Sequence, residues 1–519
     1  MSELAKPQGE QVNSSRLNFI GGAIAYAVVV LLTLGVRTVF AKQLGENYLG
    51  LNAVLLNAMA LVSVAEAGIA TAVMFRLYKP LAQGDQDDAR RWLAASRRIY
   101  RLALYAILAI GSASAFLIPL VTSDLPFKFW TVVAYSSLAV LGTAATCAFA
   151  TEKALLLAGQ KNYVVAGIQA VIVLAQAALQ ILFLHWQYAF AAFLIIQGIS
   201  VLVWNFACRV WAKRIYPRPY FDGGVEAHHK AGLREDVRNL LPYKLGAVGL
   251  NATDSILISV VLRAALAGLV SNYSLIINAI NGILMQGFNG LAAAIGIHSV
   301  QSDREQRTNI FFQLSMLSVW SFGVATVCLV VLLDQFVALW LGPTFVLGPE
   351  VVVALACVFY ITGINQVPSL YRTSLGIFRQ TRWVPLAAAI LNILVSVVLA
   401  WQIGLIGIFL GTILARLLTF NLVDPILVSR ASLAVRPLVV FARFALASLG
   451  VLVTGSGAIY LRNEFFSSSI WGFVVLAPSV LLFASVAIGA WLCLDSGFRQ
   501  LLGRVAGRLQ FVRARRAGS

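Results

Sequence analysis

Residues 19–41 read FIGGAIAYAVVVLLTLGVRTVFA, an apolar run in which Arg37 is the one charged side chain. A helix needs roughly 20 apolar residues to cross a bilayer core about 30 Å thick. This run is long enough, so it predicts a transmembrane helix. It also places a positive charge inside the bilayer, where charged side chains are costly and usually functional.

Thirteen further apolar segments follow this run. Hydrophobic residues make up 60% of the 519 residues and charged residues only 12%, a composition that excludes an ordinary soluble enzyme. We therefore expect an all-α integral membrane protein with about fourteen transmembrane helices. The predicted spans are Phe19–Ala41, Tyr48–Leu77, Ile99–Val121, Phe129–Leu157, Tyr163–Leu184, Gln187–Trp211, Val237–Leu262, Ala267–His298, Ile310–Leu333, Pro349–Ile377, Trp383–Ala400, Gly404–Val428, Leu438–Leu461 and Ile470–Leu494.

Positive charges alternate along the connections between these spans. The odd-numbered connections clearly hold only Lys42, Lys128, Arg263 and Arg462. The even-numbered ones hold Lys79, Arg90, Arg91, Arg97, Arg98, Arg101, Lys213, Arg214, Arg218, Lys230, Arg234, Arg304, Arg307, Arg379, Arg382, Arg430 and Arg436. By the positive-inside rule, the even-numbered connections and both termini are cytoplasmic. The net charge of +18 is thus spread out as a topology signal, and we expect no nucleic-acid partner.

The chain contains an internal duplication. Gly50 aligns with Gly268, and Asp85 with Asp303, each 218 residues apart (268 minus 50, 303 minus 85). This spacing indicates two copies of a six-helix bundle. Because six is even, both copies enter the membrane from the same side, as in a parallel repeat about the membrane normal.

The repeat predicts the domain organisation. We expect a cytoplasmic N-terminus (1–18), an N-lobe of spans 1–6 (19–211), a cytoplasmic linker (212–236), a C-lobe of spans 7–12 (237–428), two accessory spans (438–494) and a basic cytoplasmic tail (495–519).

Polar residues form stripes on the first two spans of each copy. Their spacing of three, four and seven residues places them on one helix face. The stripes are Tyr26, Thr33 and Arg37; Asn52, Met59, Ser63 and Glu66; Lys244, Asn251, Asp254 and Ser255; and Ser274, Asn278, Asn281, Met285 and Asn289. Equivalent positions in the two copies predict that the four helices surround one central cavity, which would be a transport path.

A purely structural role is the alternative for each polar residue. Asn and Ser side chains also join membrane helices by hydrogen bonds of about 1 kcal/mol or less, and for them the two roles stay equally open. A functional role is favoured for Arg37 and Asp254, because an unpaired charge at the bilayer centre costs at least ~2.5 kcal/mol. Glu66 could pair structurally. For Arg372, lining a cavity and snorkelling to the interface remain equal alternatives.

Several segments resemble the polysaccharide transporter family of lipid-linked oligosaccharide flippases, in the same superfamily as multidrug and toxin extruders. The resemblance is strongest in RTVFAKQLGENYLGL (37–51). It continues in AEAGIA (65–70), LYKPLA (77–82) and LLLAGQKNY (155–163). These motifs lie in the first two hundred residues, while the hydropathy pattern covers nearly the whole chain.

The resemblance implies two six-helix lobes around a cavity that opens alternately to either face. It further implies a cargo, a glycan on undecaprenyl diphosphate, that crosses the bacterial inner membrane for the synthesis of O-antigen lipopolysaccharide, capsule or exopolysaccharide. A guanidinium holds phosphate oxygens by paired, charge-assisted hydrogen bonds, and Asn amides suit sugar hydroxyls. The expected partners are this lipid-linked oligosaccharide, the bilayer, and a polymerase and glycosyltransferases of the same pathway.

The site hypotheses follow from the stripes and this chemistry. The candidate substrate-binding residues are Arg37, Tyr26, Thr33, Asn52, Ser63, Asn251, Asn278, Asn281, Asn289 and Arg372. Glu66 and Asp254 are candidates for gating or for coupling to H⁺ or Na⁺. We expect no cofactor and no metal. His228 and His229 stand beside Glu226 without a full ligand set, so we expect a solvated pair.

Two other functions compete with a flippase. A cation-coupled drug antiporter of the same superfamily would require acidic residues to dominate the cavity, whereas basic candidates outnumber Glu66 and Asp254. A glycan polymerase or ligase would need a sizeable outer loop, and the longest here is about Asp334–Gly348. The chain also lacks a GxxxxGK[ST] motif, so we expect no ATP hydrolysis and no enzymatic activity.

Overall fold

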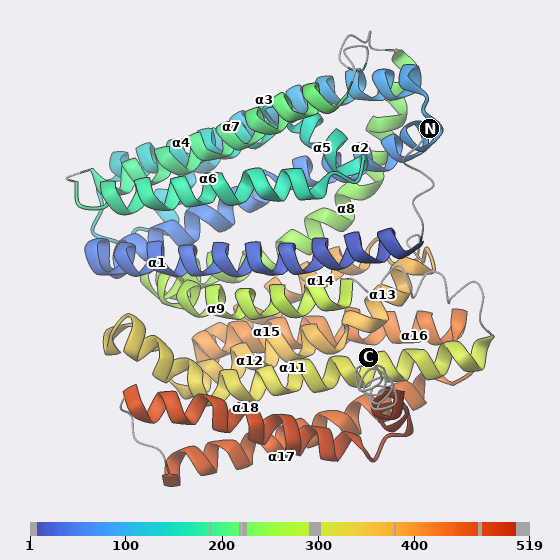
Figure 1. Cartoon of the computed structure of the whole chain (residues 1–519). Helices are drawn as coiled ribbons and strands as arrows, with labels where there is room; N and C mark the ends of the chain where they lie inside the picture. Colours follow the sequence, from blue (N-terminus) through green and yellow to red (C-terminus); the bar gives the residue numbers. More distant parts are fainter. Residues whose placement is uncertain are drawn as a thin grey trace, which may run out of the picture. The chain divides into compact units, whose positions relative to one another are not determined.

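The computed structural model describes residues 8–186, 188–216, 220, 226–289, 303–377, 380–465 and 470–504. Every regular element within these ranges is helical (Figure 1). Among the described residues, thirteen helices are long and apolar enough to cross a membrane. This number counts α1 as one helix, although α1 contains two helices joined at Gly45. The predicted all-α membrane fold is confirmed, and the chain is a multi-pass membrane protein.

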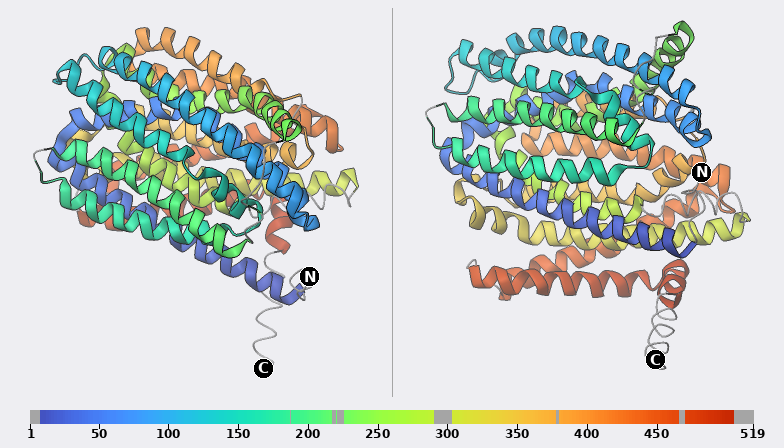
Figure 2. Two further views of the ribbon diagram at one scale, coloured as in Figure 1. Left: turned by 90° about the horizontal axis from the view of Figure 1, so that it is seen from above. Right: turned by 45° about the horizontal axis from the view of Figure 1, so that its top comes forward.

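The chain divides into two compact units, residues 1–271 and 272–519. The N-terminal unit contains α1 (Gln8–Val62), α2 (Val64–Gln83), α3 (Gln86–Val121), α4 (Phe129–Ala144), η1 (Ala145–Cys147), α5 (Ala150–Ala158), α6 (Asn162–Phe183), α7 (Ala189–Ile215), α8 (Ala227–Leu257), η3 (Ile258–Leu262) and the start of α9 (Ala264–Asn289). Its blue, cyan and green helices lie alongside one another in each view (Figure 2).

The C-terminal unit contains the rest of α9 and a second series of helices. These are α11 (Arg304–Trp340), η4 (Pro343–Phe345), α12 (Pro349–Ile364), α13 (Gln366–Ser374), α14 (Val384–Ile403), α15 (Leu405–Leu418), α16 (Phe420–Ser432), α17 (Pro437–Phe465) and α18 (Ile470–Leu492). The units divide inside α9, and α8 packs against α1, α2 and α3. The lobes 19–211 and 237–428 therefore remain a prediction from the repeat.

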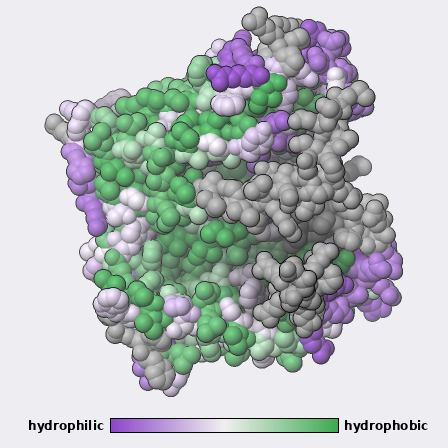
Figure 3. Space-filling view, in the orientation of Figure 1, coloured by the Kyte–Doolittle hydropathy of each residue, from purple (hydrophilic) through white to green (hydrophobic). Residues whose placement is uncertain are grey.

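Apolar residues cover the outer surface of the helices. Leu31, Phe75 and Leu452 are 68%, 69% and 64% exposed. On the face drawn in Figure 3, hydrophobic residues occupy the middle stretches of the helices and hydrophilic ones gather near their ends. A bilayer removes such side chains from water, so this exposure is expected of membrane-spanning helices.

Equivalent positions of the two copies have the same local structure. Asp85 caps α3 by accepting a hydrogen bond from the backbone N–H of Asp88 at 2.9 Å. Asp303, 218 residues later, caps α11 in the same way from the N–H of Gln306 at 2.8 Å. An N-cap carboxylate satisfies a backbone donor that has no partner inside the helix. This function explains why the aligned aspartates match.

Four predicted spans are not continuous helices, which corrects the sequence analysis. The interruptions are at Ser63 in Tyr48–Leu77, Phe149 in Phe129–Leu157, Asn365 in Pro349–Ile377 and Thr419 in Gly404–Val428. Phe149 has a φ of 58°, in the left-handed region. None of the four residues is itself Gly or Pro, although Pro368 follows Asn365 by three residues and marks the break there.

At these breaks, backbone carbonyl groups lose their partners within the helix, and side chains from neighbouring helices donate hydrogen bonds to them. Asn205 of α7 donates from Nδ2 to the carbonyl oxygens of Ala145 and Thr146 at 3.2 and 3.1 Å. In the C-terminal unit, Asn421 of α16 donates to the carbonyl oxygen of Ile361 at 2.9 Å. A lipid environment offers no water for such groups, so internal partners are required.

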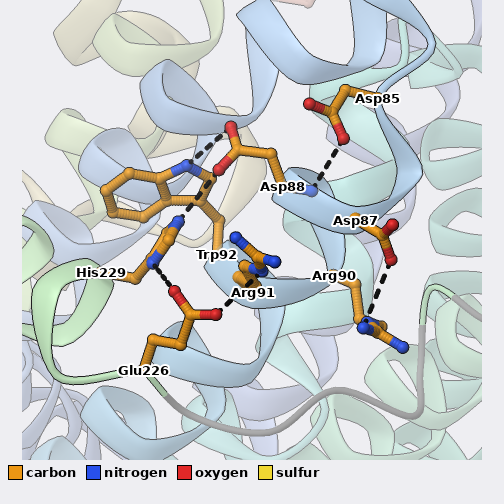
Figure 4. A network of polar contacts seen from close by, with 8 residues as sticks. All are labelled: Asp85, Asp87, Asp88, Arg90, Arg91, Trp92, Glu226 and His229. Carbon is orange, nitrogen blue, oxygen red and sulfur yellow. Dashed lines mark hydrogen bonds and ion pairs between the residues drawn. The ribbon is translucent and has the colours of Figure 1, made fainter.

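A polar network joins the start of α3 to the start of α8 (Figure 4). His229 is 7% exposed, with Nε2 at 2.9 Å from Asp88 and Nδ1 at 3.2 Å from Glu226. Its ring packs edge-on against Trp92, whose Nε1 donates to Asp88 at 3.2 Å. The prediction of a solvated histidine pair is therefore wrong for His229, because α3 lies against the segment that looked like an open loop.

Replacing Trp92 with alanine should lower the free energy of unfolding by about 3–5 kcal/mol, the usual range for a buried Trp. The indole is 8% exposed and also lies 4.8 Å beneath the guanidinium of Arg76. Unfolding midpoints in detergent micelles would measure the loss. Trp130, which is 71% exposed, supplies the matched control: an equal shift in Trp130→Ala would contradict the prediction.

Candidate functional site

The polar stripe of the second predicted span lines a cavity inside the N-terminal unit. The cavity has a volume of about 220 Å³ and lies between α1, α4 and α7. Asn52 and Met59 of α1 and Ser63, directly after α1, contribute to its wall, as the seven- and four-residue spacing predicts. Its other polar lining residues are Thr143, Thr146 and Gln197.

Asn52 is the most deeply buried polar residue of this wall. Its side chain is 3% exposed, and its Oδ1 atom is buried without a hydrogen-bond partner. Buried polar atoms are nearly always satisfied, so an unsatisfied acceptor in a cavity wall calls for an explanation, such as a bound ligand or water. Ser63, by contrast, donates to the carbonyl oxygen of Ala60 at 3.2 Å.

Glycines bring α4 and α7 together beside the cavity. A Cβ atom on Gly142 would lie 3.3 Å from the Cα of Gly198, closer than ordinary van der Waals contact. Both glycines line the cavity. Small residues at membrane-helix crossings let two backbones approach closely, which here fixes the back wall.

Arg37 lies in the first helix of α1 and reaches the first turns of α9. Its guanidinium donates to the carbonyl oxygen of Gly268 at 3.5 Å and to the hydroxyl of Ser271. Ser271 itself donates to the Gly268 carbonyl at 2.6 Å. Both of these acceptors are neutral oxygens. The predicted approach of Arg37 to Asp254 remains a prediction.

The repeat-equivalent glycines lie against each other at the same place. A Cβ on Gly50 would lie 2.5 Å from the carbonyl oxygen of Ala264. A Cβ on Gly268 would collide with the backbone of Leu49 and Gly50. The crossing of α1 with the start of α9 thus requires glycine on both sides, which accounts for the Gly50–Gly268 match in the sequence.

Glu66 does not share the cavity wall with the rest of its predicted stripe. The helix is interrupted at Ser63 (φ −87°, ψ 2°), and Glu66, in the first turn of α2, is not among the residues that line the cavity. The carboxylate instead interacts electrostatically with Lys153 of α5, and Tyr100 of α3 lies within its field. The placement of Glu66 on the Asn52 stripe is therefore wrong, while its role in gating or ion coupling stays a prediction.

Arg372 is buried in the C-terminal unit and pairs there with Asp424. Its Nε lies 3.1 Å from Oδ1 of Asp424, and the two side chains are 2% and 1% exposed. Arg372 also donates to Thr381 at 3.0 Å and to Ser369 at 3.2 Å, while Asn365 donates to Asp424 at 3.0 Å. The snorkelling alternative does not hold, because Arg372 is buried against Asp424, a partner that the sequence analysis overlooked. The cavity-lining alternative stays a prediction.

The remaining candidates are placed as follows. Thr33 and Asn251 are exposed and bond to carbonyls of their own helices, at Val29 and Ala247. Tyr26 and Asp254 are half-buried, and Asn278 is exposed. Asn281 has a buried Oδ1 without a hydrogen-bond partner. The side chain of Asn289 and the tail beyond Arg504 lie outside the described residues.

Sequence reasoning missed four polar residues that the structure makes important. Thr143, Thr146 and Gln197 complete the cavity wall, and Asp424 pairs with Arg372. All four lie inside predicted apolar spans, so their polarity was the available signal. Among the described residues, no cluster of three or more His, Cys, Asp or Glu side chains could hold a metal ion.

Comparisons with known proteins identify the fold. No protein-family model and no curated protein matches this sequence. The solved structure of lipid II flippase MurJ in an inward closed conformation is similar, with 14% identity over 90% of this chain and 98% of that one and a TM-score of 0.66. An inward-facing multidrug resistance MATE family transporter of the MOP superfamily has 11% identity, covers 79% and 98% of the two chains and gives a TM-score of 0.61.

An outward-facing MATE family transporter of the same superfamily gives a TM-score of 0.52, with 11% identity over 79% of this chain and 96% of that one. Identities this low establish a shared fold and nothing finer. This chain therefore has the helical membrane fold found in the MurJ flippase and in MATE family transporters of the MOP superfamily.

Proposed function

We propose that this protein is a flippase that moves an undecaprenyl-diphosphate-linked oligosaccharide repeat unit across the bacterial inner membrane by alternating access. The observation that carries the proposal is the uncharged polar wall of the cavity. Asn52, Thr143 and Gln197 offer amide and hydroxyl groups, and no described lining residue has a carboxylate. Such groups suit sugar hydroxyls, whereas cation paths in membranes use acidic side chains.

The size of the cavity limits what it could accept. A volume of about 220 Å³ corresponds to roughly seven water molecules at ~30 Å³ each. That space admits part of a glycan, and the polyprenyl chain would remain in the bilayer. The diphosphate would be held elsewhere, for which Arg37 offers a guanidinium now bonded to neutral oxygens.

The extent of the structural match supports a lipid flippase over a drug antiporter. The MurJ match extends over 90% of the chain, whereas the MATE matches reported above extend over 79%. A polymerase or ligase is disfavoured further, because α11 continues to Trp340 and shortens the outer connection to residues 341–348.

A cation-coupled antiporter is the second candidate, and Glu66 is the observation that favours it. Its carboxylate lies inside the N-terminal unit within the field of Lys153. In a flippase the same group, or Asp254, could couple cargo movement to H⁺ or Na⁺. Efflux of cationic dyes from cells that express the protein would favour the antiporter.

The deciding experiment is reconstitution in liposomes with a fluorescent lipid-diphosphate glycan and an assay of its accessibility in each leaflet. The wild-type protein should equilibrate the probe between leaflets, and Asn52→Leu should slow it. Asn57→Leu is the matched control, because Asn57 lies on the same helix, bonds to the Ala53 carbonyl and does not line the cavity. Absence of glycan movement together with dye transport would overturn the proposal.

The proposed orientation puts both termini in the cytoplasm. An enzyme reporter that is active only outside the cytoplasm, fused after Ser519, should therefore give no activity. The same reporter inserted in the connection at residues 341–348 should be active. Strong reporter activity from the C-terminal fusion would contradict this orientation and place the C-terminus outside the cytoplasm.

A further inference from the structure

A second cavity lies at one end of the α17–α18 pair in the C-terminal unit. These helices run back along each other, and both pack on α11 (Figure 1). Where α17 begins and α18 ends, a cavity of about 260 Å³ is lined in part by Arg443, Trp491, Asp495 and Arg499. This cavity contains none of the predicted transport residues.

One wall of this cavity is an indole held in a fixed position. Trp491 donates from Nε1 to the carbonyl oxygen of Leu446 at 2.9 Å. Its ring lies so close to Gly450 that a Cβ atom there would collide with it. Leu446 and Leu494, which also line the cavity, are 52% and 67% exposed, so apolar surface continues from the cavity mouth.

The positive charge of Arg443 is held close to the cavity but only partly neutralised. Its guanidinium lies 3.9 Å from the centre of the Phe312 ring and 3.5 Å from Oδ2 of Asp495. The other oxygen of Asp495 accepts hydrogen bonds from the N–H groups of Gly497 and Phe498, at 2.7 and 3.3 Å. Asp495 therefore also caps the helical segment that follows it.

Arg499 adds a second cation to the same wall. It lies one turn beyond Asp495, is exposed and lines the cavity. The cavity wall thus contains two arginines and one carboxylate, and that carboxylate also accepts from backbone donors. The cavity combines net positive charge, an oriented tryptophan and adjoining apolar surface.

We propose that this cavity binds the phosphate headgroup of an anionic phospholipid, with the acyl chains lying along Leu446 and Leu494. Arginine is the preferred partner of phosphate oxygens, and tryptophan concentrates at membrane interfaces. Basic pockets between transmembrane helices are known to bind anionic headgroups. The proposal concerns a bilayer lipid at the α17–α18 pair and is independent of which cargo the protein carries.

Native mass spectrometry of the purified protein tests the proposal, with phosphatidylglycerol or phosphatidylcholine added and no cargo present. The wild-type protein should retain phosphatidylglycerol in preference. Arg443→Gln and Arg499→Gln should each lower that retention roughly tenfold, as the loss of one charge-assisted phosphate contact predicts. Arg436→Gln is the matched control: Arg436 is exposed near the start of α17 and does not line the cavity.

Three results would overturn the proposal. One is equal retention of the two lipids by the wild-type protein. Another is equal retention of phosphatidylglycerol by Arg499→Gln and by the Arg436→Gln control. This comparison still decides the question if Arg443→Gln misfolds after losing its contacts to Phe312 and Asp495. The third concerns competition for bound phosphatidylglycerol. If inorganic phosphate displaced it as effectively as the same concentration of added phosphatidylglycerol, the cavity would be a site for free anions.

Discussion

Replacing Arg37 with alanine should lower transport roughly ten- to hundredfold, the equivalent of losing a hydrogen bond to a charged group worth about 1.5–3 kcal/mol. The expectation rests on the proposed function and on the contacts of the side chain. Arg37 donates to the Gly268 carbonyl and the Ser271 hydroxyl, neutral oxygens that a diphosphate could replace at a gain in electrostatic energy. Transport of the lipid-linked glycan in liposomes is the measurement.

Conservative variants separate charge from geometry at this position. Arg37→Lys should restore only part of the activity, because an ammonium group lacks the planar fork that holds two phosphate oxygens. Asp254→Asn should lower transport less than Arg37→Ala, because only Arg37 would contact the diphosphate of the cargo. Lys42 is the matched control, an exposed cation five residues further along the same helix. Full transport by Arg37→Ala at normal membrane abundance would exclude a role in cargo binding.

Sequence patterns predicted the membrane architecture because long apolar runs and loop charges are local properties. They also predicted that Asn52, Met59 and Ser63 share a wall, since helical spacing alone fixes that relation. The same rule failed at Glu66, which lies beyond the break at Ser63 and does not line the cavity. That break depends on backbone geometry that no Gly or Pro announced.

Partners that lie far apart in the sequence were beyond this reasoning. Arg372 pairs with Asp424 from a different predicted span, and His229 is covered by α3 from more than a hundred residues earlier. In both cases, burial depends on how helices pack, which periodicity does not determine. The repeat offers a clue to the first pair, because Asp424 lies 219 residues after Asn205. Asn205 donates to the carbonyl of Ala145, and Asp424 accepts from the side chain of Asn365 at another helix break.

Breaking the Arg372–Asp424 pair from one side should be the most destabilising change in the C-terminal unit. Removing one partner leaves a buried, uncompensated charge, which typically costs about 3–5 kcal/mol. Asp424→Asn and Arg372→Met should each therefore lower the unfolding midpoint strongly and reduce the amount of protein in the membrane. Asp303→Asn, at the exposed cap of α11, is the control and should change the midpoint little.

The double variant Arg372→Met with Asp424→Leu tests whether the ion pair stabilises the fold or takes part in transport. Replacing both buried charges with apolar groups of similar volume is often neutral or stabilising. If the pair only holds α13 against α16, the double variant should recover the stability that either single change loses and should transport the glycan normally. Recovered stability without transport would instead assign Arg372 a direct part in moving the cargo, as a cavity residue exposed in another state of the transport cycle. The predicted outcome is recovery of both stability and transport, because Arg372 contacts Asp424, Thr381 and Ser369, which all belong to the C-terminal unit.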